Sequence, residues 1–166
     1  MKNLFKSCKD MILTILVMIF LMNFVFINAY IPSGSMENTI MTGDRVFGVR
    51  FLKNYDRGDI VIFKDPDGGG YYLIKRIIGL PGETVEIRDG KVYVNKTKLD
   101  EPYLKEEMTK EEEFSITLPE DGYFVMGDNR NDSYDARYWE HKIVFEDNIA
   151  GKALFRYWPI NQMKKL

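Results

Sequence analysis

The sequence predicts a mainly β domain of antiparallel sheets, preceded by one membrane-spanning helix. Two patterns support this fold class. From Met11 to Ile31 the chain has 21 residues without a charge. After Pro32 the apolar residues recur in short runs with a period of two, as in half-buried strands. The full length of 166 residues suits one folded domain of ordinary size behind the apolar segment.

The uncharged run is long enough to cross a lipid bilayer as a helix. At about 1.5 Å per residue it would measure roughly 31 Å, close to the thickness of the hydrocarbon layer. Three lysines lie on its N-terminal side: Lys2, Lys6 and Lys9. Because positive residues favour the cytoplasmic side, we expect residues 1–10 in the cytoplasm, a transmembrane anchor over 11–31 and an extracytoplasmic domain at the cell membrane over 32–166.

Two other interpretations of this run remain open. A cleaved secretory signal has a shorter apolar stretch and small residues at the first and third positions before the cut. Ala29 would fit the first position, but Ile27 is a bulky third. A core helix of the folded domain would also be apolar. We favour the permanent single-pass anchor.

The rest of the chain predicts strands and turns. Short alternating runs predict strands at Arg45–Val49, Asp59–Phe63, Tyr71–Ile78, Thr84–Arg88, Lys91–Asn95, Phe114–Leu118, Tyr123–Met126 and Ala150–Tyr157. Asp89 and Gly90 join two of these strands and suit the positive φ angles of a type I′ hairpin turn. Beyond the anchor we expect only one helical turn, at Tyr138–His141. We expect the acidic stretch 100–113 to be a solvated loop.

Composition narrows the possible functions. With 45% hydrophobic and 29% charged residues the chain is expected to fold. A net charge of −2 argues against a nucleic-acid partner. Cys8 is the only cysteine, so an internal disulfide cannot form and a cysteine-rich zinc site cannot be assembled. We expect no metal and no cofactor.

Three polar segments interrupt the apolar pattern. They are the serine turn at 33–35 directly after the membrane segment, the pair Lys75 and Arg76 within a strand, and the charged run 127–139. Neighbouring residues of a strand point to opposite faces, so one of the two cations faces inward. Burial disfavours a charged ammonium and lowers its pKa, and an inward Lys75 would therefore be a base.

A serine hydroxyl becomes a good nucleophile only when a neighbouring base takes its proton. The only histidine is His141, which we interpret as a loop residue. A serine and lysine pair is therefore the simpler alternative to a triad of serine, histidine and aspartate.

Several blocks resemble type I signal peptidases, the membrane-bound serine peptidases that remove signal peptides from exported proteins. The blocks are PSGSM at 32–36, GDRV at 43–46, RGDIVIF at 57–63, IKRIIGLPGE at 74–83, GDNRNDSYDARYW at 127–139 and GKA at 151–153. The resemblance implies that Ser35 is the nucleophile and Lys75 the general base. It further implies that Ser133 orients the lysine, and that Ser33 contributes to the oxyanion hole beside the Ser35 N–H.

The same resemblance implies the residues around this pair and the fold that holds them. Residues expected to brace the site without touching the scissile bond are Asp128, Arg130, Asp135 and Arg137. Residues expected around the substrate pockets are Ile31, Pro32, Met36 and Ile74. The fold would be several antiparallel sheets with a partly barrel-like core, and the substrate would carry Ala-X-Ala before the cut.

The chain departs from the family pattern at three places. Asn38 stands where the family commonly has proline, which could loosen the turn behind Ser35. Val144 and Phe145 stand near another common proline, where we expect an effect on a connection only. The stretch 83–122 is short, and we expect it to form only a hairpin and a loop.

The expected partners are preprotein signal peptides and membrane lipid, with the secretion translocon close by and no nucleic acid. One alternative is a dedicated peptidase that matures one pilin or surface protein. Another is a membrane-tethered β domain that binds partners and cleaves nothing.

Overall fold

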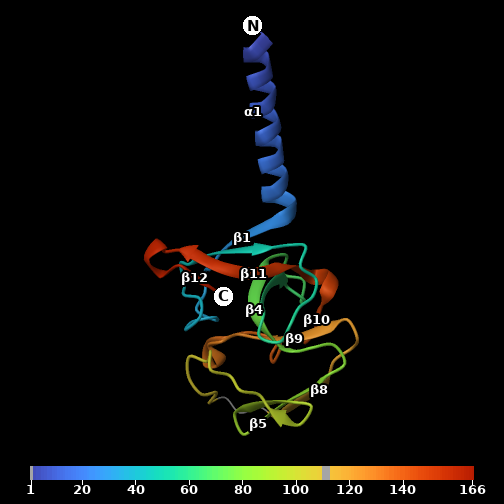
Figure 1. The fold of residues 1–166 in the computed structure, drawn as a ribbon. Coiled ribbons are helices and arrows are strands. Elements are labelled where there is room, and N and C mark those ends of the chain that lie inside the picture. Colours follow the sequence, from blue (N-terminus) through green and yellow to red (C-terminus); the bar gives the residue numbers. More distant parts are fainter. Residues whose placement is uncertain (1, 110–112) are drawn as a thin grey trace.

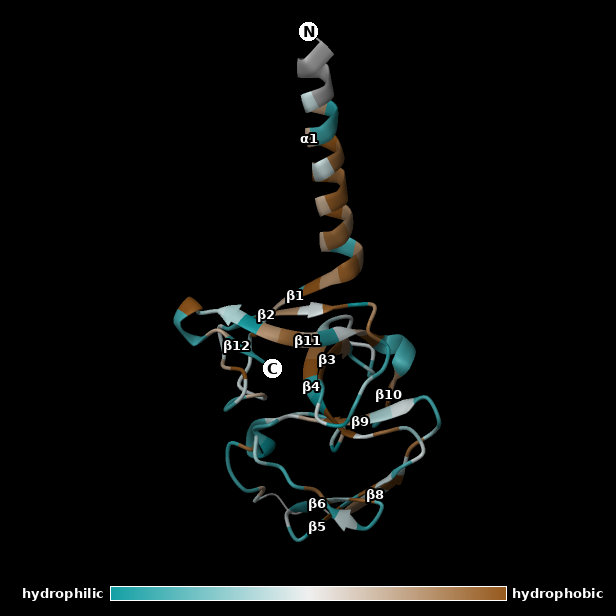
Figure 2. Cartoon of the chain, viewed as in Figure 1, coloured by the Kyte–Doolittle hydropathy of each residue, from teal (hydrophilic) through white to brown (hydrophobic). Residues whose placement is uncertain are grey.

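The computed structural model describes residues 2–109 and 113–166, and it begins with a helix that extends away from a β domain (Figure 1). Helix α1 covers Lys2–Phe20 and continues as a π-helical turn, η1, over Leu21–Val25. The stretch Ser7–Val25 is long and apolar enough to cross a membrane. Its apolar side chains are exposed rather than packed on the domain, and the apolar helix stands clear of the domain (Figure 2), which excludes a core helix.

The helix ends at Val25, so the prediction of a helical span up to Ile31 is wrong at its C-terminal end. Strand β1, Phe26–Tyr30, follows directly and pairs antiparallel with β2, Arg45–Val49. Within β1, Ile27 is buried whereas its neighbour Asn28 is exposed. A short apolar run does not by itself distinguish a helix from a strand, and here pairing with β2 decides for the strand.

The larger sheet has the order β1-β2-β11-β3-β4-β9-β10, with β12 paired to β11, and all its pairs are antiparallel. The remaining members are β3 at Ile60–Lys64, β4 at Tyr72–Gly79, β9 at Gly122–Met126, β10 at Val144–Phe145, β11 at Ile149–Trp158 and β12 at Lys164–Lys165. The sheet curls on itself beneath the helix (Figure 1). The predicted mainly antiparallel β fold behind one helix is confirmed.

A smaller sheet lies at the end of the domain away from α1 (Figure 1). Its order is β7-β6-β5-β8, and its strands are β5 at Thr84–Arg88, β6 at Lys91–Val94, β7 at Thr97–Lys98 and β8 at Phe114–Thr117. Asp89 and Gly90 have φ angles of 50° and 65°, which confirms the predicted tight hairpin. The expectation of only a hairpin and a loop is wrong, because β7 and β8 complete a four-stranded sheet.

Other local predictions also need correction. Residues Tyr138–His141 form no helical turn; a turn ends there instead, with Tyr138 N–H donating to the Asp135 carbonyl at 2.8 Å. Short 3₁₀ helices occur at Arg130–Asp132, Glu146–Asn148 and Ile160–Gln162. Val144 and Phe145 do more than connect, since they pair with β9 as β10.

The acidic stretch 100–113 is not simply a solvated loop. Residues 110–112 lie outside the described part, but the Glu101 carboxylate pairs with Arg130 and its side chain is only 8% exposed. Met108 is buried as well. Charge density in the sequence does not reveal a buried partner elsewhere in the chain.

Two apolar cores lie on opposite sides of β3 and β4. Val61 and Phe63 of β3 belong to the larger core, and Ile60 belongs to the smaller one. The same holds for β4, where Ile77 packs in the larger core and Ile74 against the smaller one. Because both faces of these strands are covered, residues at successive positions are buried.

Candidate active site

The loop between β1 and β2 presents Ser35. It is closed at its base by two backbone hydrogen bonds, from Ile31 N–H to the Asp44 carbonyl at 3.0 Å and from Gly43 N–H to the Ile31 carbonyl at 2.8 Å. Met36 is fully buried in the smaller core and anchors the loop from inside. These contacts hold Ser35 in a defined position beside β4.

Asn38 fits the conformation of the loop and links it to a distant segment. Its φ angle is 87°, a left-handed conformation that proline cannot adopt and that asparagine tolerates. Its side-chain amide donates to the carbonyls of Tyr103 and Leu104 at 3.0 and 3.2 Å. The departure from the family pattern is therefore matched to the conformation of this turn.

Lys75 reaches Ser35 from β4. Its Nζ lies 2.6 Å from Ser35 Oγ, and the two residues are 3% and 7% exposed. The two-residue period of the strand puts Lys75 on the same face as Ile77 and Val61, its partner in β3. Ile74, which was expected near the substrate pockets, belongs to the opposite face.

Burial lowers the pKa of Lys75 from 10.5 to about 8. The Arg137 guanidinium also lowers this pKa, whereas the carboxylates of Asp135 and Asp128 raise it by less than burial lowers it. At pH 7 a pKa of about 8 leaves roughly one amine in ten neutral, against about one in a few thousand for an ordinary lysine. The pair can therefore supply a neutral amine in contact with a hydroxyl.

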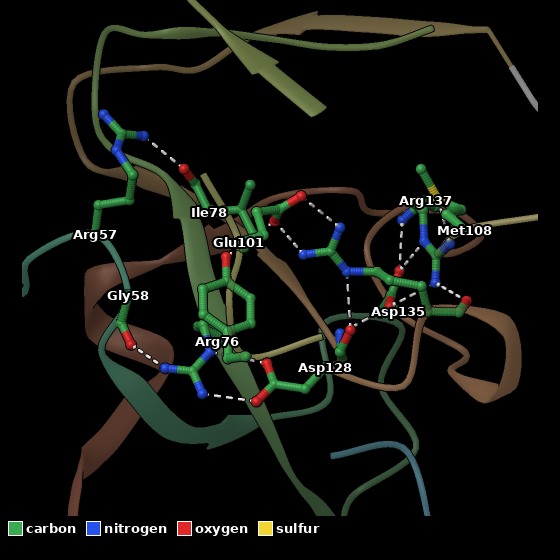
Figure 3. A network of polar contacts seen from close by, with 12 residues as sticks. Arg57, Gly58, Arg76, Ile78, Glu101, Met108, Asp128, Asp135 and Arg137 are labelled. Carbon is green, nitrogen blue, oxygen red and sulfur yellow. Dashed lines mark hydrogen bonds and ion pairs between the residues drawn. The ribbon is translucent and has the colours of Figure 1, made fainter. Parts of the chain in front are cut away.

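Arg76, the neighbour of Lys75, is also buried, at 8% exposed. Its guanidinium donates to both oxygens of Asp128, at 2.8 and 2.6 Å, and to the Gly58 carbonyl at 2.6 Å (Figure 3). Thr39 donates to the same Asp128 carboxylate at 2.5 Å. The sequence indicated that one of the two cations faces inward; in fact both do, because both faces of β4 are covered.

The segment after β9 is held by two further ion pairs. Arg137 donates to the two Asp135 oxygens at 2.8 and 3.0 Å (Figure 3), and Arg130 pairs with Glu101. Arg130 also donates to the Gly127 carbonyl at 3.0 Å. The four residues predicted to brace the site, Asp128, Arg130, Asp135 and Arg137, are thus all buried and paired.

The same segment contacts the Ser35 loop directly. Asn129 N–H donates to the Ser35 carbonyl at 3.1 Å, and the Asn129 side-chain amide donates to the Gly34 carbonyl at 3.1 Å. A Cβ on Gly127 would lie 2.4 Å from the Ser35 carbonyl oxygen and 2.3 Å from Ser133 Oγ, so only glycine permits this approach. The sequence did not identify Asn129 or Thr39 as site residues, although Asn129 lies inside the GDNR block, and it gave Arg76 no role in the site.

The remaining predicted site residues differ in how deeply they are buried. Ser133 is buried, and its hydroxyl donates to Asp135 at 2.7 Å. Ser33 and Pro32 are exposed, whereas Ile31 and Met36 are buried. Among the described residues, no hydrogen bond joins Ser133 or Ser33 to the Ser35 and Lys75 pair. Within the same residues, no cluster of three histidine, cysteine or acidic side chains could hold a metal ion.

A groove of about 270 Å³ includes Pro32 and Ile74, close in sequence to Ser35 and Lys75, in its lining, although Ser35 and Lys75 themselves do not line it. It runs between the end of β1 and the start of β4, and its lining is mostly apolar. The lining residues are Ile27, Asn28, Ala29, Tyr30, Ile31, Pro32, Arg50, Ile62, Tyr72, Leu73 and Ile74. Of the four predicted substrate-pocket residues, Ile31, Pro32 and Ile74 line it, and Met36 lies in the core behind.

Comparison with known proteins agrees with this geometry. The chain matches the model of the family described as signal peptidase, peptidase S26, over residues 4–158. It is 34% identical to signal peptidase I S of Bacillus subtilis, over 99% of this chain and 94% of that protein. It is 39% identical to a probable signal peptidase I-2 of Synechocystis, over 92% of this chain and 72% of that protein.

A solved structure is similar as well. The crystal structure of a signal peptidase I from Enterococcus faecalis matches with a TM-score of 0.52 and 37% identity, covering 60% of this chain and 96% of that chain. These relatives do not favour a non-catalytic binding domain or a peptidase for one surface protein. Since the family model spans most of the chain and the relatives align along nearly all of it, the chain belongs to the signal peptidase I family of S26 serine peptidases.

Proposed function

We propose that this chain is a membrane-anchored endopeptidase that removes signal peptides from exported preproteins, with Ser35 as nucleophile and Lys75 as general base. The observation that carries the proposal is the 2.6 Å contact between Lys75 Nζ and Ser35 Oγ, made by a lysine whose pKa burial lowers to about 8.

The reaction follows from the protonation state of that lysine. The neutral amine takes the Ser35 hydroxyl proton while Oγ attacks the scissile carbonyl carbon, and negative charge develops on the carbonyl oxygen. The Ser35 N–H and the Ser33 hydroxyl would donate to that oxygen. The Lys75 ammonium then gives its proton to the leaving amine, and the regenerated amine activates a water that hydrolyses the acyl-enzyme.

Ser133 is proposed to orient Lys75. Its hydroxyl proton is directed to Asp135, which leaves the oxygen lone pairs available to an ammonium that forms during the reaction. A small shift of the lysine after proton transfer would make this contact.

The groove between β1 and the start of β4 is proposed to hold the substrate as an extended strand that leads to the pair. Strand β4 pairs with β9 only from Arg76 onward, so among the described strands residues 72–75 have an unpaired edge on that side. An extended peptide can add to such an edge. With Ile31 and Ile74 in its lining, the groove favours small side chains such as those of Ala-X-Ala.

Lipid contact is proposed for the end of the domain nearest α1. Exposed apolar side chains gather on the elements there: Tyr30 at the end of β1, Phe51 after β2, Trp158 at the end of β11, and Ile160 and Met163 after it. With the N-terminus in the cytoplasm, these groups and Ser35 would face the outer surface of the bilayer, where emerging signal peptides and the secretion translocon are found.

Cleavage of a purified preprotein with an Ala-X-Ala site, in detergent, tests the proposed activity. The wild-type chain should cleave it, and Ser35→Ala and Lys75→Ala should each reduce the rate by about 10⁴-fold. Matched controls are Ser115→Ala and Lys91→Ala, because both residues are exposed and lie in the smaller sheet rather than in the sheet that carries Lys75. Unchanged cleavage by either dyad variant would refute the assignment. Several preproteins in the same assay distinguish a general enzyme from a dedicated one.

The orientation can be tested with Cys8, the only cysteine of the chain. In intact cells a membrane-impermeant maleimide should leave Cys8 unlabelled and should label a Ser115→Cys variant. Labelling of Cys8 in intact cells would contradict a cytoplasmic N-terminus.

A further inference from the structure

Asn129 holds the peptide unit that joins Gly34 to Ser35. We propose that Asn129 is a positioning residue that fixes and polarises the Ser35 N–H for the negatively charged oxygen of the transition state. This inference rests on the proposed peptidase function and deepens it.

The contacts involve both carbonyls next to the nucleophile. The Gly34 carbonyl accepts from the Asn129 side-chain amide at 3.1 Å and from Glu37 N–H at 3.0 Å. The Ser35 carbonyl accepts from Asn129 N–H at 3.1 Å. Asn129 therefore donates hydrogen bonds to the carbonyls on both sides of the Ser35 Cα, one from its side chain and one from its backbone.

The first of these contacts also constrains the Ser35 N–H. A trans peptide is planar, so its N–H points away from its C=O. Two donors on the Gly34 oxygen resist rotation of the Gly34–Ser35 peptide plane and thereby set the direction of the Ser35 N–H. Donation to a carbonyl also strengthens the N–H of the same amide as a donor, because chains of hydrogen bonds polarise one another.

The amide oxygen of Asn129, Oδ1, argues against a purely structural role for this residue. Asn129 is 1% exposed, and within the described part of the chain its Oδ1 is buried without a hydrogen-bond partner. A buried, unsatisfied acceptor costs about 1–3 kcal/mol. The opposite orientation of the amide would set Oδ1 against a carbonyl oxygen. Stability alone would favour an apolar residue here, so the Nδ2 donor is the feature that accounts for an asparagine.

The test is Asn129→Leu in the full chain, assayed on the Ala-X-Ala preprotein. Leucine has a similar volume, lacks the donor and removes the orphan acceptor, while the backbone N–H remains. We expect kcat to fall roughly 10- to 100-fold, since complete loss of one oxyanion donor costs about 10²–10³-fold. KM should stay within about twofold, the acid limb of the pH profile should not move, and the Tm should not fall.

A peptide aldehyde that ends in alanine gives a second readout. Ser35 Oγ adds to the aldehyde carbon while its proton passes to the Lys75 amine, and the former carbonyl oxygen becomes the negatively charged oxygen of the hemiacetal at the oxyanion position. The affinity of Asn129→Leu for this aldehyde should fall by about the same factor as its kcat. Asn131→Leu is the matched control, because Asn131 lies in the same segment and its side chain bonds, among the described residues, to the 106–109 loop and not to the Ser35 loop.

Each outcome bears on the inference. If Asn129→Leu keeps its kcat and its aldehyde affinity within about twofold of wild type, the inference is overturned. It is also overturned if Asn129→Leu and Asn129→Ala both lose activity only in proportion to lost folded protein. Failure of the wild-type chain to cleave any preprotein would instead overturn the proposed function, so the two failures are distinguishable.

Discussion

Lys75 and Arg76 are consecutive buried cations on one strand, and their surroundings differ. Arg76 meets a carboxylate with two hydrogen bonds, donates to the Gly58 carbonyl and stacks 4.1 Å from the centre of the Tyr103 ring. Lys75 meets the Ser35 hydroxyl. A guanidinium keeps its charge in proteins, whereas an ammonium without a partnered carboxylate can release a proton. Among the described residues Arg76 has a carboxylate partner and Lys75 has none, and this difference supports the proposal that Lys75 acts as the base.

The largest expected effect comes from making the two positions alike. Lys75→Arg keeps a cation at position 75 but removes the possibility of deprotonation. We expect preprotein cleavage to fall by about 10⁴-fold, measured as kcat/KM at pH 8. Lys64→Arg is the control on an exposed lysine. Retention of more than about a tenth of the activity would mean that position 75 needs only a charge.

The next largest effect concerns the paired cation. Arg76→Met leaves the Asp128 carboxylate buried without its principal partner, and loss of one member of a buried pair costs about 3–5 kcal/mol. Denaturant unfolding in detergent should show a loss of that size. A loss below about 1 kcal/mol would contradict the view that this pair supports the site.

Lys75→Met should raise the free energy of unfolding, whereas Arg76→Met should lower it. In the folded chain burial lowers the pKa of Lys75 from 10.5 to about 8, so below pH 8 both folded and unfolded chains carry the charge and folding bears the full cost of burying it. This cost is about 3 kcal/mol and disappears above pH 10.5, where both states are neutral. Lys75→Met should therefore be more stable than wild type at pH 7, and its advantage should shrink between pH 8 and 10.5. An advantage that does not change over this range would show that the lysine is not desolvated.

The contrast between the two cations was only partly visible in the sequence. The alternating pattern of apolar and polar residues predicts strand β4 and the opposite directions of its neighbouring side chains. This interpretation assumes that only one face of the strand is buried. The second core, built on Met36 and Ile40 from a distant loop, covers the other face and buries Arg76. The local sequence pattern also could not predict that the helix ends at Val25, because the next residues form strand β1 through pairing with β2.

Some residues of the candidate site could be predicted from the sequence, and others could not. The proposed nucleophile and base, Ser35 and Lys75, follow from residue type and from a family resemblance. Asn129 and Glu101 act through contacts with residues far away in the chain, and such contacts leave no periodic pattern.

The smallest expected effect concerns the turn behind Ser35. Asn38→Pro introduces the residue common in the family, but the φ angle of 87° is closed to proline. We expect a loss of about 1–2 kcal/mol in the free energy of unfolding, with activity reduced less than in any dyad variant. Asn38→Gly, which tolerates the angle, is the control. A variant with proline that is as stable as wild type would show that the turn can change its conformation.

A direct titration of Lys75 tests the central claim. In a chain labelled with ¹³C-lysine in detergent, the Cε resonance that is missing from the Lys75→Arg spectrum should titrate with a midpoint near pH 8, in line with the pKa of about 8. The acid limb of kcat/KM should have the same midpoint. A midpoint at the ordinary lysine value of 10.5 would mean that the amine stays charged beside Ser35, and the proposed base would be contradicted.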